Sequence, residues 1–267
     1  MRLHRVTMQY HRRAPTVLNE VTLDLPEGSL FYLRGANGSG KSTLLRIIAG
    51  ITRPSAGVVE GRPRTVGYVP ERFPAGLRFS TVEYLTLLGH IRGLRTPEAH
   101  VGELLDRFEL GAFAGTRMDH LSKGTTQKVA AAQAFLAHPP VLILDESWTG
   151  LDVTAHGALT ALVSEHRRAG ALILFTDHRG RARQLEPDAV YLVAGGDVVP
   201  SSEDRAAPAS RVELVGPVDG FDAASLPGVV SFAYLPGGLE VRVEPASCDQ
   251  LLRAALGQGL SVRRVEP

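Results

Sequence analysis

Short apolar runs alternate with helical segments along the first three quarters of the chain. The runs at 29–34, 141–144 and 171–175 are apolar on both faces, which is typical of strands buried in a parallel sheet. Between them, residues 43–49 are predicted to form a buried helix, and residues 153–168 a second one. The alternation predicts an α/β fold built on a mostly parallel sheet.

Between about residues 72 and 138 the pattern is helical, which predicts a helical subdomain inserted into the sheet domain. The pair Ser80 and Glu83 has the spacing of a capping box and starts a helix expected over 80–94. The apolar stripe expected on this helix consists of Tyr84, Leu87, Leu88 and Ile91. Further helices are expected over about 97–108 and 126–137.

A polar stretch flanked by prolines, residues 200–208, predicts a linker. Beyond it the pattern predicts four strands, at 212–215, 229–235, 239–243 and 260–265, and one helix at 250–256. We therefore expect two domains: residues 1–204, which include the helical insertion, and a small C-terminal α+β domain at 209–267.

Composition narrows the possible partners. The formal net charge is +1, so we expect no nucleic-acid partner. The single cysteine, Cys248, excludes an internal disulfide framework and fits a reducing compartment. We find no secretion segment, and the longest apolar run, Val141 to Leu144, is far shorter than the roughly 20 residues that a membrane helix needs. We therefore expect a protein that meets a membrane only through a partner.

A glycine-rich segment after the first buried strand predicts a phosphate-binding loop. It has the pattern G-x-x-x-x-G-K-[ST] and consists of Gly35, Ala36, Asn37, Gly38, Ser39, Gly40, Lys41, Ser42 and Thr43. The glycines allow consecutive N–H groups to face phosphate, and the next helix adds its positive end. Lys41 is expected to reach the β- and γ-phosphates, and the Ser42 hydroxyl to coordinate Mg²⁺.

Two carboxylates end the strand 141–144, at the edge of the sheet where open α/β folds bind ligands. We expect Asp145 to hold Mg²⁺, directly or through water, and Glu146 to orient or deprotonate the attacking water. Another strand ends at Thr176-Asp177-His178, and His178 is expected to link the γ-phosphate to that water. A histidine in this position is structural in many proteins, so only the surrounding pattern gives it a catalytic role.

The segment Leu121-Ser122-Lys123-Gly124-Thr125-Thr126-Gln127-Lys128 opens a helix 24 residues before Asp145. Here the chain resembles the ATP-binding cassette (ABC) ATPases, whose signature is L-S-G-G-Q. The phosphate loop alone would also fit kinases and GTPases. The resemblance covers about residues 1–204. It implies a cassette fold with a mostly parallel core, an antiparallel β edge and a helical signature subdomain.

The resemblance also implies roles for further residues. Tyr10 occupies the place of an aromatic ring that stacks on adenine, and Asp152 closes the D-loop, residues 149–152. In this family two cassettes sandwich two ATP molecules, so Ser122 and Gly124 are expected to act on the nucleotide of a second copy or a homologous cassette. This role is physically reasonable, because Ser122 offers a hydroxyl, Gly124 offers an unobstructed backbone N–H, and the N-terminus of the helix carries a partial positive charge that attracts phosphate.

The chain departs from the family pattern at three positions. Lys123 replaces glycine and Thr125 replaces glutamine in the signature, while Glu71 replaces the usual glutamine of the Q-loop. Lys123 and Glu71 look like variants in bacterial exporter ATPases with separately encoded permeases. The resemblance thus implies a cytoplasmic, peripheral subunit on the inner face of the cell membrane, bound to an integral-membrane permease. The expected ligands of Mg²⁺ are therefore Ser42, Asp145 and Glu71.

A soluble ABC ATPase without a permease is the main alternative. DNA-repair and chromosome-structuring members insert long coiled coils, whereas only 78 residues without heptads separate Ser42 from Leu121 here. Translation factors carry two cassettes, and a small-molecule kinase would lack the signature. An iron–sulfur assembly factor remains open at this point, and the transported substrate contacts the permease and leaves no trace in this sequence.

Overall fold

The computed structural model describes residues 1–11, 14–74, 76–177, 185–201, 210–218 and 220–266 of the 267-residue chain. Its backbone contacts divide the chain into two compact units. The first comprises Met1–Asp177 and Pro187–Pro200, and the second contains the C-terminal strands and helix. None of the helices in the described ranges is both long and apolar enough to span a membrane.

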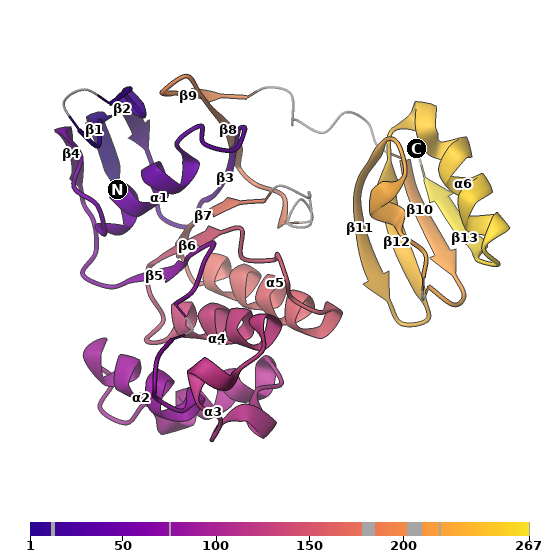
Figure 1. Ribbon diagram of the computed structural model, residues 1–267. Coiled ribbons are helices and arrows are strands. Elements are labelled where there is room, and N and C mark those ends of the chain that lie inside the picture. Colours follow the sequence, from indigo (N-terminus) through magenta and orange to yellow (C-terminus); the bar gives the residue numbers. More distant parts are fainter. Residues whose placement is uncertain (12–13, 75, 178–184, 202–209, 219, 267) are drawn as a thin grey trace. The chain divides into compact units, whose positions relative to one another are not determined.

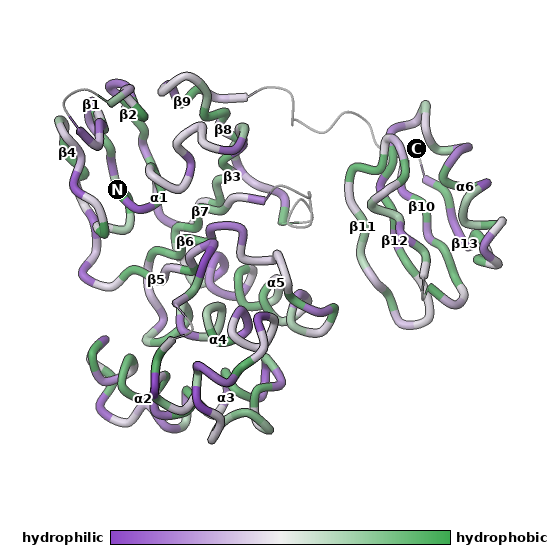
Figure 2. Tube along the Cα trace, viewed as in Figure 1, coloured by the Kyte–Doolittle hydropathy of each residue, from purple (hydrophilic) through white to green (hydrophobic). Residues whose placement is uncertain are grey.

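The core of the first unit is a six-stranded sheet in the order β5-β6-β7-β3-β8-β9 (Figure 1). All neighbouring strands pair in parallel except β8 and β9, which pair antiparallel. Figure 2 shows the central strands as largely hydrophobic, as expected of strands covered on both faces. Their bounds are β3 Leu30–Arg34, β5 Val66–Val69, β6 Val141–Asp145, β7 Leu172–Thr176, β8 Ala189–Ala194 and β9 Asp197–Pro200.

An antiparallel three-stranded sheet, β2-β1-β4, forms the edge of this unit. Its strands are β1 Arg2–Met8, β2 Leu18–Asp24 and β4 Ala56–Glu60. Buried side chains of β1 and β2, such as Leu3 and Leu18, share one core with Leu44 and Ile47 of helix α1, Lys41–Ala49. The two sheets therefore enclose α1, whose first residue is the lysine of the phosphate loop. The predicted cassette architecture, with a parallel core and an antiparallel edge, is confirmed.

Helices α2 Thr81–Ile91, α3 Glu98–Arg107 and α4 Lys123–Phe135 form the helical part. The capping box at the start of α2 is present: Ser80 N donates to Glu83 Oε2 at 2.8 Å, and Glu83 N donates to Ser80 Oγ at 3.3 Å. The expected apolar stripe is wrong in part. The buried positions of α2 are Thr81, Leu85 and Gly89, while Leu87 and Ile91 are 43% and 69% exposed.

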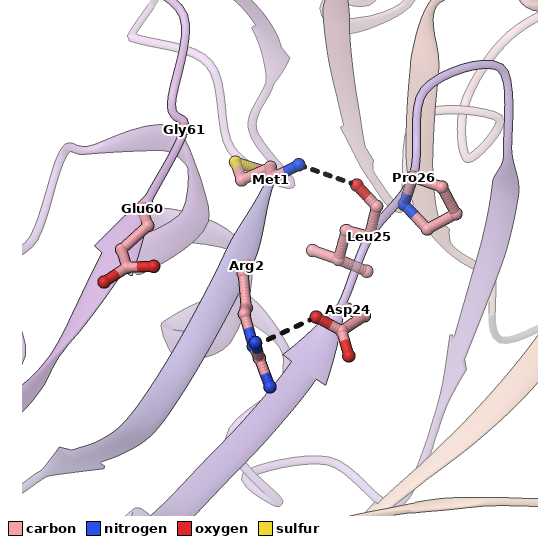
Figure 3. A pocket seen from close by; sticks show the side chains of 7 residues that line it. All are labelled: Met1, Arg2, Asp24, Leu25, Pro26, Glu60 and Gly61. Atoms are coloured by element: carbon pink, nitrogen blue, oxygen red, sulfur yellow. Dashed lines mark hydrogen bonds and ion pairs between the residues drawn. The ribbon is translucent and has the colours of Figure 1, made fainter.

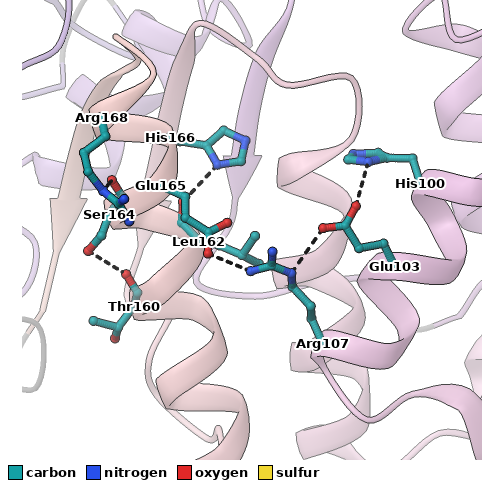
Figure 4. Close-up of polar contacts among 9 residues, drawn as sticks. All are labelled: His100, Glu103, Arg107, Thr160, Leu162, Ser164, Glu165, His166 and Arg168. Carbon is teal, nitrogen blue, oxygen red and sulfur yellow. Dashed lines mark hydrogen bonds and ion pairs between the residues drawn. The ribbon is translucent and has the colours of Figure 1, made fainter.

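Helix α5, Val153–Arg168, is joined to the helical part by an ion-pair network (Figure 4). Arg107 of α3 contacts Glu165 of α5 through Nη1 at 2.9 Å and Glu103 of its own helix through Nε at 3.2 Å. Beside it, His166 packs edge-on against Phe135 at the end of α4, and its Nδ1 lies 2.9 Å from Leu162 O. Burial lowers the pKa of His166 and so favours the neutral form of its ring.

The second unit has a sheet of its own, in the order β11-β12-β10-β13, with every pair antiparallel. The elements are β10 Ser210–Val215, β11 Val229–Leu235, β12 Gly238–Val243, α6 Cys248–Gly257 and β13 Ser261–Glu266. Alternate residues of β10 and β12, such as Val212 and Val241, are buried together with Leu251 and Ala255 of α6. The described residues of this unit therefore form a hydrophobic core of their own.

Candidate functional site

The phosphate loop lies between β3 and α1 and needs glycine at two close approaches. Gly35 and Gly40 have φ angles of 152° and 109°. A Cβ atom at Gly35 would lie 2.3 Å from Val193 O, and one at Gly40 would lie 3.0 Å from Val17 O. The loop can therefore keep this path only without side chains at these positions, which leaves its backbone N–H groups available to an anion. Gly38 also has a positive φ, of 78°.

Lys41 is buried at the start of α1, below this loop. Its Nζ donates to the carbonyls of Gly35 at 2.8 Å and Ala36 at 2.9 Å. Burial lowers the pKa of Lys41, and the carboxylates of Glu146, Asp145 and Glu71, in that order, oppose the shift. All three acids are therefore close enough to act on the lysine charge. Glu71, on an irregular segment after β5, thus belongs to the same electrostatic environment as the phosphate loop.

The two acids after β6 are held by a residue of the neighbouring strand. Thr176, at the end of β7, lies opposite Asp145 in the parallel register. Its Oγ1 donates to Asp145 Oδ1 at 2.9 Å and accepts from Glu146 N at 2.9 Å. The second carboxylate oxygen of Asp145, Oδ2, is buried and accepts no hydrogen bond from the described residues. One hydroxyl therefore holds both acids, and one acidic oxygen has no protein partner in that part of the chain.

Tyr10 lies at the outer edge of the site and is 49% exposed. Its hydroxyl is 2.9 Å from Thr43 Oγ1, so the ring is attached to the first turn of α1. Asn37 and Ser39 lie on the loop, and Ser42 is half-buried on α1 between Lys41 and Thr43. The structure therefore brings Tyr10 together with the phosphate loop, from 25 residues away in sequence.

The signature residues begin helix α4, and Ser122 is its N-cap. Ser122 Oγ accepts from Thr125 N at 3.1 Å and lies 2.8 Å from Thr125 Oγ1, so the departure at Thr125 retains a polar contact within the signature. Ser122 is exposed, and the backbone of Gly124 runs close to Gly150 of the D-loop: a Cβ on Gly124 would lie 3.4 Å from Gly150 O. The signature and the D-loop of this chain are therefore neighbours.

Asp152 is both an N-cap and an ion-pair partner. Its Oδ1 accepts from Ala155 N at 2.9 Å at the start of α5, and its Oδ2 lies 2.7 Å from Nζ of Lys128. These contacts lower the pKa of Asp152, Lys128 being the larger cause. From the sequence, Asp152 was expected to serve the nucleotide only, and no role was expected for Lys128 or Thr176. Thr176 could have been suspected, because it ends a buried strand beside two acids.

Two remaining features lie outside this arrangement. His178 falls outside the described residues, so its expected contact with the γ-phosphate stays a prediction. A pocket of about 440 Å³ lies on the antiparallel edge, between Met1, Arg2, Asp24, Leu25, Pro26, Glu60 and Gly61 (Figure 3). Within it, the terminal amine donates to Leu25 O at 3.0 Å and Arg2 pairs with Asp24 at 3.1 Å. It shares no residue with the phosphate loop.

Comparison with known proteins decides the family. A profile of the ABC transporter family matches residues 18–149. The ABC transporter ATP-binding protein NatA of Bacillus subtilis is 30% identical over 72% of this chain and 83% of its own length. The chain belongs to the ABC transporter ATP-binding proteins. The assignment made from the signature segment is confirmed, and with it the activity of an ATPase that binds ATP.

Other ABC relatives differ in what their names say. The zinc import ATP-binding protein ZnuC of Halorhodospira halophila is 33% identical over 80% of this chain and 79% of its own length. The uncharacterised ABC transporter ATP-binding protein YhaQ of Bacillus subtilis is 35% identical over 59% of this chain and 56% of YhaQ. The chain thus spans just over half the length of YhaQ. The direction of transport does not follow from these relatives.

Solved ABC cassettes have the same fold. An ATP-binding subunit of an ABC transporter matches with a TM-score of 0.66 and 30% identity, over 76% of this chain and 90% of that one. A dimeric cassette bound to ADP and Pi, in a post-hydrolysis state, matches with a TM-score of 0.67 and 23% identity, over 75% and 97%. In both cases the match leaves about a quarter of this chain without a counterpart.

The chemistry of the site fits Mg²⁺. Among the described residues, no three histidine, cysteine, aspartate or glutamate side chains are grouped as a metal site. Mg²⁺ does not need such a cage, because proteins hold it through one or two carboxylates and substrate phosphates, with water completing the shell. The buried oxygen of Asp145 and the hydroxyl of Ser42 are hard ligands of this kind, next to a loop built for phosphates.

Proposed function

We propose that Lys41, Ser42 and Asp145 hold the triphosphate and its magnesium ion. The observation that carries this proposal is the buried Asp145 Oδ2, which accepts no hydrogen bond from the described residues, at the strand edge facing the phosphate loop. A bound Mg²⁺ would neutralise phosphate charge during transfer. Lys41 would exchange its bonds to the Gly35 and Ala36 carbonyls for phosphate oxygens. Glu71 adds a further carboxylate on the metal side.

Glu146 and His178 act on water in this proposal. The Glu146 carboxylate is largely buried next to Asp145, and a glutamate in such a position can orient the attacking water and accept its proton. His178 follows the strand that carries Thr176 and would contact the γ-phosphate. Tyr10 would stack on the adenine ring, and its bond to Thr43 supports this role by fixing the ring beside α1.

The hydrolytic unit that we propose is a pair of cassettes. Ser122 is exposed and caps α4, so its hydroxyl and the N–H of Gly124 are available to the nucleotide of a second copy or a homologue. Asp152 would support that interface from the D-loop. The dimeric state of the cassette bound to ADP and Pi is a property of that protein, and it agrees with this arrangement.

The pair powers transport through an integral-membrane permease, and the direction that we propose is export. Helix α2 presents two exposed apolar side chains one turn apart, Leu87 and Ile91, which are 43% and 69% exposed. The same helix contacts the segment that follows Glu71, where Tyr84 packs against Phe73. Apolar surface of this kind is typical of a protein interface. Export rests on Glu71, Lys123 and the C-terminal unit, which resemble variants found in exporter ATPases.

Co-expression with the permease encoded nearest to this gene tests the proposal. The complex should co-purify, and Leu87→Glu with Ile91→Glu on α2 should abolish co-purification while the chain still binds ATP. Val58→Glu, an equally exposed apolar position on β4, is the matched control and should leave the complex intact. ATP-driven release of substrate from loaded cells supports export, whereas ATP-driven accumulation would overturn it. A wild-type chain that binds no permease would favour a soluble ABC ATPase.

A further inference from the structure

Thr176 is a fully buried residue that contacts both acids of the hydrolytic site. It ends β7, and the parallel register sets it directly opposite Asp145 of β6. Its hydroxyl has one hydrogen, which goes to Asp145 Oδ1, while its oxygen accepts the backbone N–H of Glu146. Both distances are 2.9 Å. The hydroxyl therefore connects the carboxylate of Asp145, the proposed metal ligand, to the backbone of Glu146, the proposed base.

The bond to Asp145 selects the oxygen that is available for a cation. The Asp145 carboxylate accepts the Thr176 hydroxyl at Oδ1, so it can rotate only by breaking that hydrogen bond. Both residues are buried, so water cannot readily replace the lost bond. Oδ2 is then the oxygen without a hydrogen-bond partner among the described residues. A partner behind a metal ligand is known generally to orient it and to tune its affinity.

The bond to Glu146 holds an uncommon backbone conformation. Glu146 has a φ of 53°, in the left-handed region that residues with a Cβ rarely adopt. Such a conformation persists where surrounding contacts determine it. The N–H of Glu146 points at Thr176, so the same hydroxyl that fixes Asp145 also fixes the direction in which the Glu146 side chain leaves the strand.

We propose that Thr176 is a positioning residue for hydrolysis, which sets the Asp145 carboxylate for Mg²⁺ and Glu146 for water. This inference rests on the proposed roles of those two acids. Threonine to valine keeps the shape and removes the hydroxyl, whereas threonine to serine keeps the hydroxyl and removes a methyl group. Thr176→Val therefore tests the hydrogen bonds, and Thr176→Ser tests the packing.

The experiment measures ATP hydrolysis and nucleotide binding by the full chain, each at a series of Mg²⁺ concentrations. We expect Thr176→Val to lower kcat by about 10- to 100-fold and to raise the Mg²⁺ concentration for half-maximal activity, since outer partners of metal ligands have effects of this size. Binding of an ATP analogue in the presence of chelator should change by less than about twofold, while the gain in affinity on adding Mg²⁺ should shrink. Thr176→Ser should restore most of both quantities.

Two controls separate positioning from folding. Thr81→Val removes another fully buried threonine hydroxyl, which bonds Thr116 O at 3.3 Å at the start of α2, and should leave the Mg²⁺ dependence unchanged. The sole tryptophan, Trp148, packs against Phe175 beside Thr176, so its fluorescence reports whether the strand edge is native in each variant. If Thr176→Val does not fold, Thr176→Ala and Thr176→Ser replace it in the same measurements.

The outcomes are distinguishable from failure of the proposed function. A wild-type chain whose ATP affinity and hydrolysis ignore Mg²⁺ would refute the roles of Asp145 and Glu146 themselves. A wild-type chain that needs Mg²⁺, together with a folded Thr176→Val of unchanged kcat and Mg²⁺ dependence, would refute only the role of Thr176. Equal losses in Thr176→Ser and Thr176→Val would assign the residue to packing and overturn the inference.

Discussion

Lys128 and Asp152 are joined by an ion pair, with 2.7 Å between Nζ and Oδ2. The lysine lies on the signature helix, and the aspartate ends the D-loop and caps α5. Both segments are expected to meet the nucleotide of a partner cassette. The pair therefore links the signature helix directly to the D-loop of the same chain.

A double-mutant cycle on this pair should give a coupling free energy of about 0.5 kcal/mol, because the Asp152 side chain is 56% exposed and solvent screens the interaction. Lys128→Met, Asp152→Asn and the double variant would be compared by urea unfolding. Asparagine retains the cap, so the cycle isolates the charge. The contribution should be present above the ordinary pKa of aspartate and lost as pH falls through the lowered pKa of Asp152. Lys123→Met, at an exposed neighbouring position, serves as the control and should show no coupling with Asp152→Asn. If the effects of Lys128→Met and Asp152→Asn on the free energy of unfolding add up to that of the double variant, the coupling is excluded.

Replacing Glu146 and Lys41 should separate hydrolysis from binding. Glu146→Gln should retain ATP affinity and reduce turnover by about 10²-fold or more, since the carboxylate acts on water and leaves the phosphate cradle intact. Lys41→Ala should weaken nucleotide binding itself, because a buried ammonium next to the loop is removed. Equilibrium titration and phosphate release measure the two effects. Equal affinity of wild type and Lys41→Ala would refute the phosphate-loop assignment.

With hydrolysis blocked, ATP should assemble the cassette pair. Glu146→Gln should change from monomer towards dimer on addition of ATP and Mg²⁺, because the nucleotide binds the closed state and stabilises it by mass action. Sedimentation measures this change, with ATP present at a concentration well above its dissociation constant. The matched control is Ser122→Ala in the same background, which should dimerise less. A monomer at all concentrations would argue against a homodimer of isolated chains, and the assembled complex would then be tested.

Glu71→Gln should alter the magnesium dependence of ATP binding. Glutamate adds a negative charge that favours Mg²⁺ and, without the metal, repels the triphosphate. The charge acts on Lys41 in this structure, which supports its proximity to the site. We therefore expect Glu71→Gln to narrow the affinity difference between ATP with magnesium and ATP with chelator. An unchanged difference would remove Glu71 from the metal set and leave Ser42 and Asp145.

Alkaline pH should reveal the buried phenol of Tyr84. Its hydroxyl donates to Gln133 Oε1 at 2.7 Å, and burial raises the pKa of Tyr84 to about 12. Between the ordinary tyrosine pKa of about 10 and this value, the unfolded chain loses a proton that the folded chain keeps, so stability falls by up to about 1.4 kcal/mol per pH unit. The stability difference between wild type and Tyr84→Phe, measured by urea unfolding, should therefore shrink from pH 9 to pH 11. A constant difference would contradict it.

Local sequence was sufficient to place the glycine-rich loop between a strand and a helix, because its glycines, lysine and hydroxyls are contiguous. The acids after β6 were predictable for the same reason. That the loop residues bind ATP stays a prediction. Contacts between separate helices and strands could not be predicted from local sequence. Thr176 acts through the register of two parallel strands, and Lys128 reaches Asp152 only once α4 and α5 are packed. On α2, Leu87 and Ile91 fit a helical stripe, yet the buried line runs through Leu85 and Gly89.

The separate core of the C-terminal unit has an evolutionary consequence. The buried residues described for it, from Val212 to Leu260, pack among themselves in a cluster of their own. A module with a core of its own can be acquired, replaced or lost by recombination as a single segment of the gene.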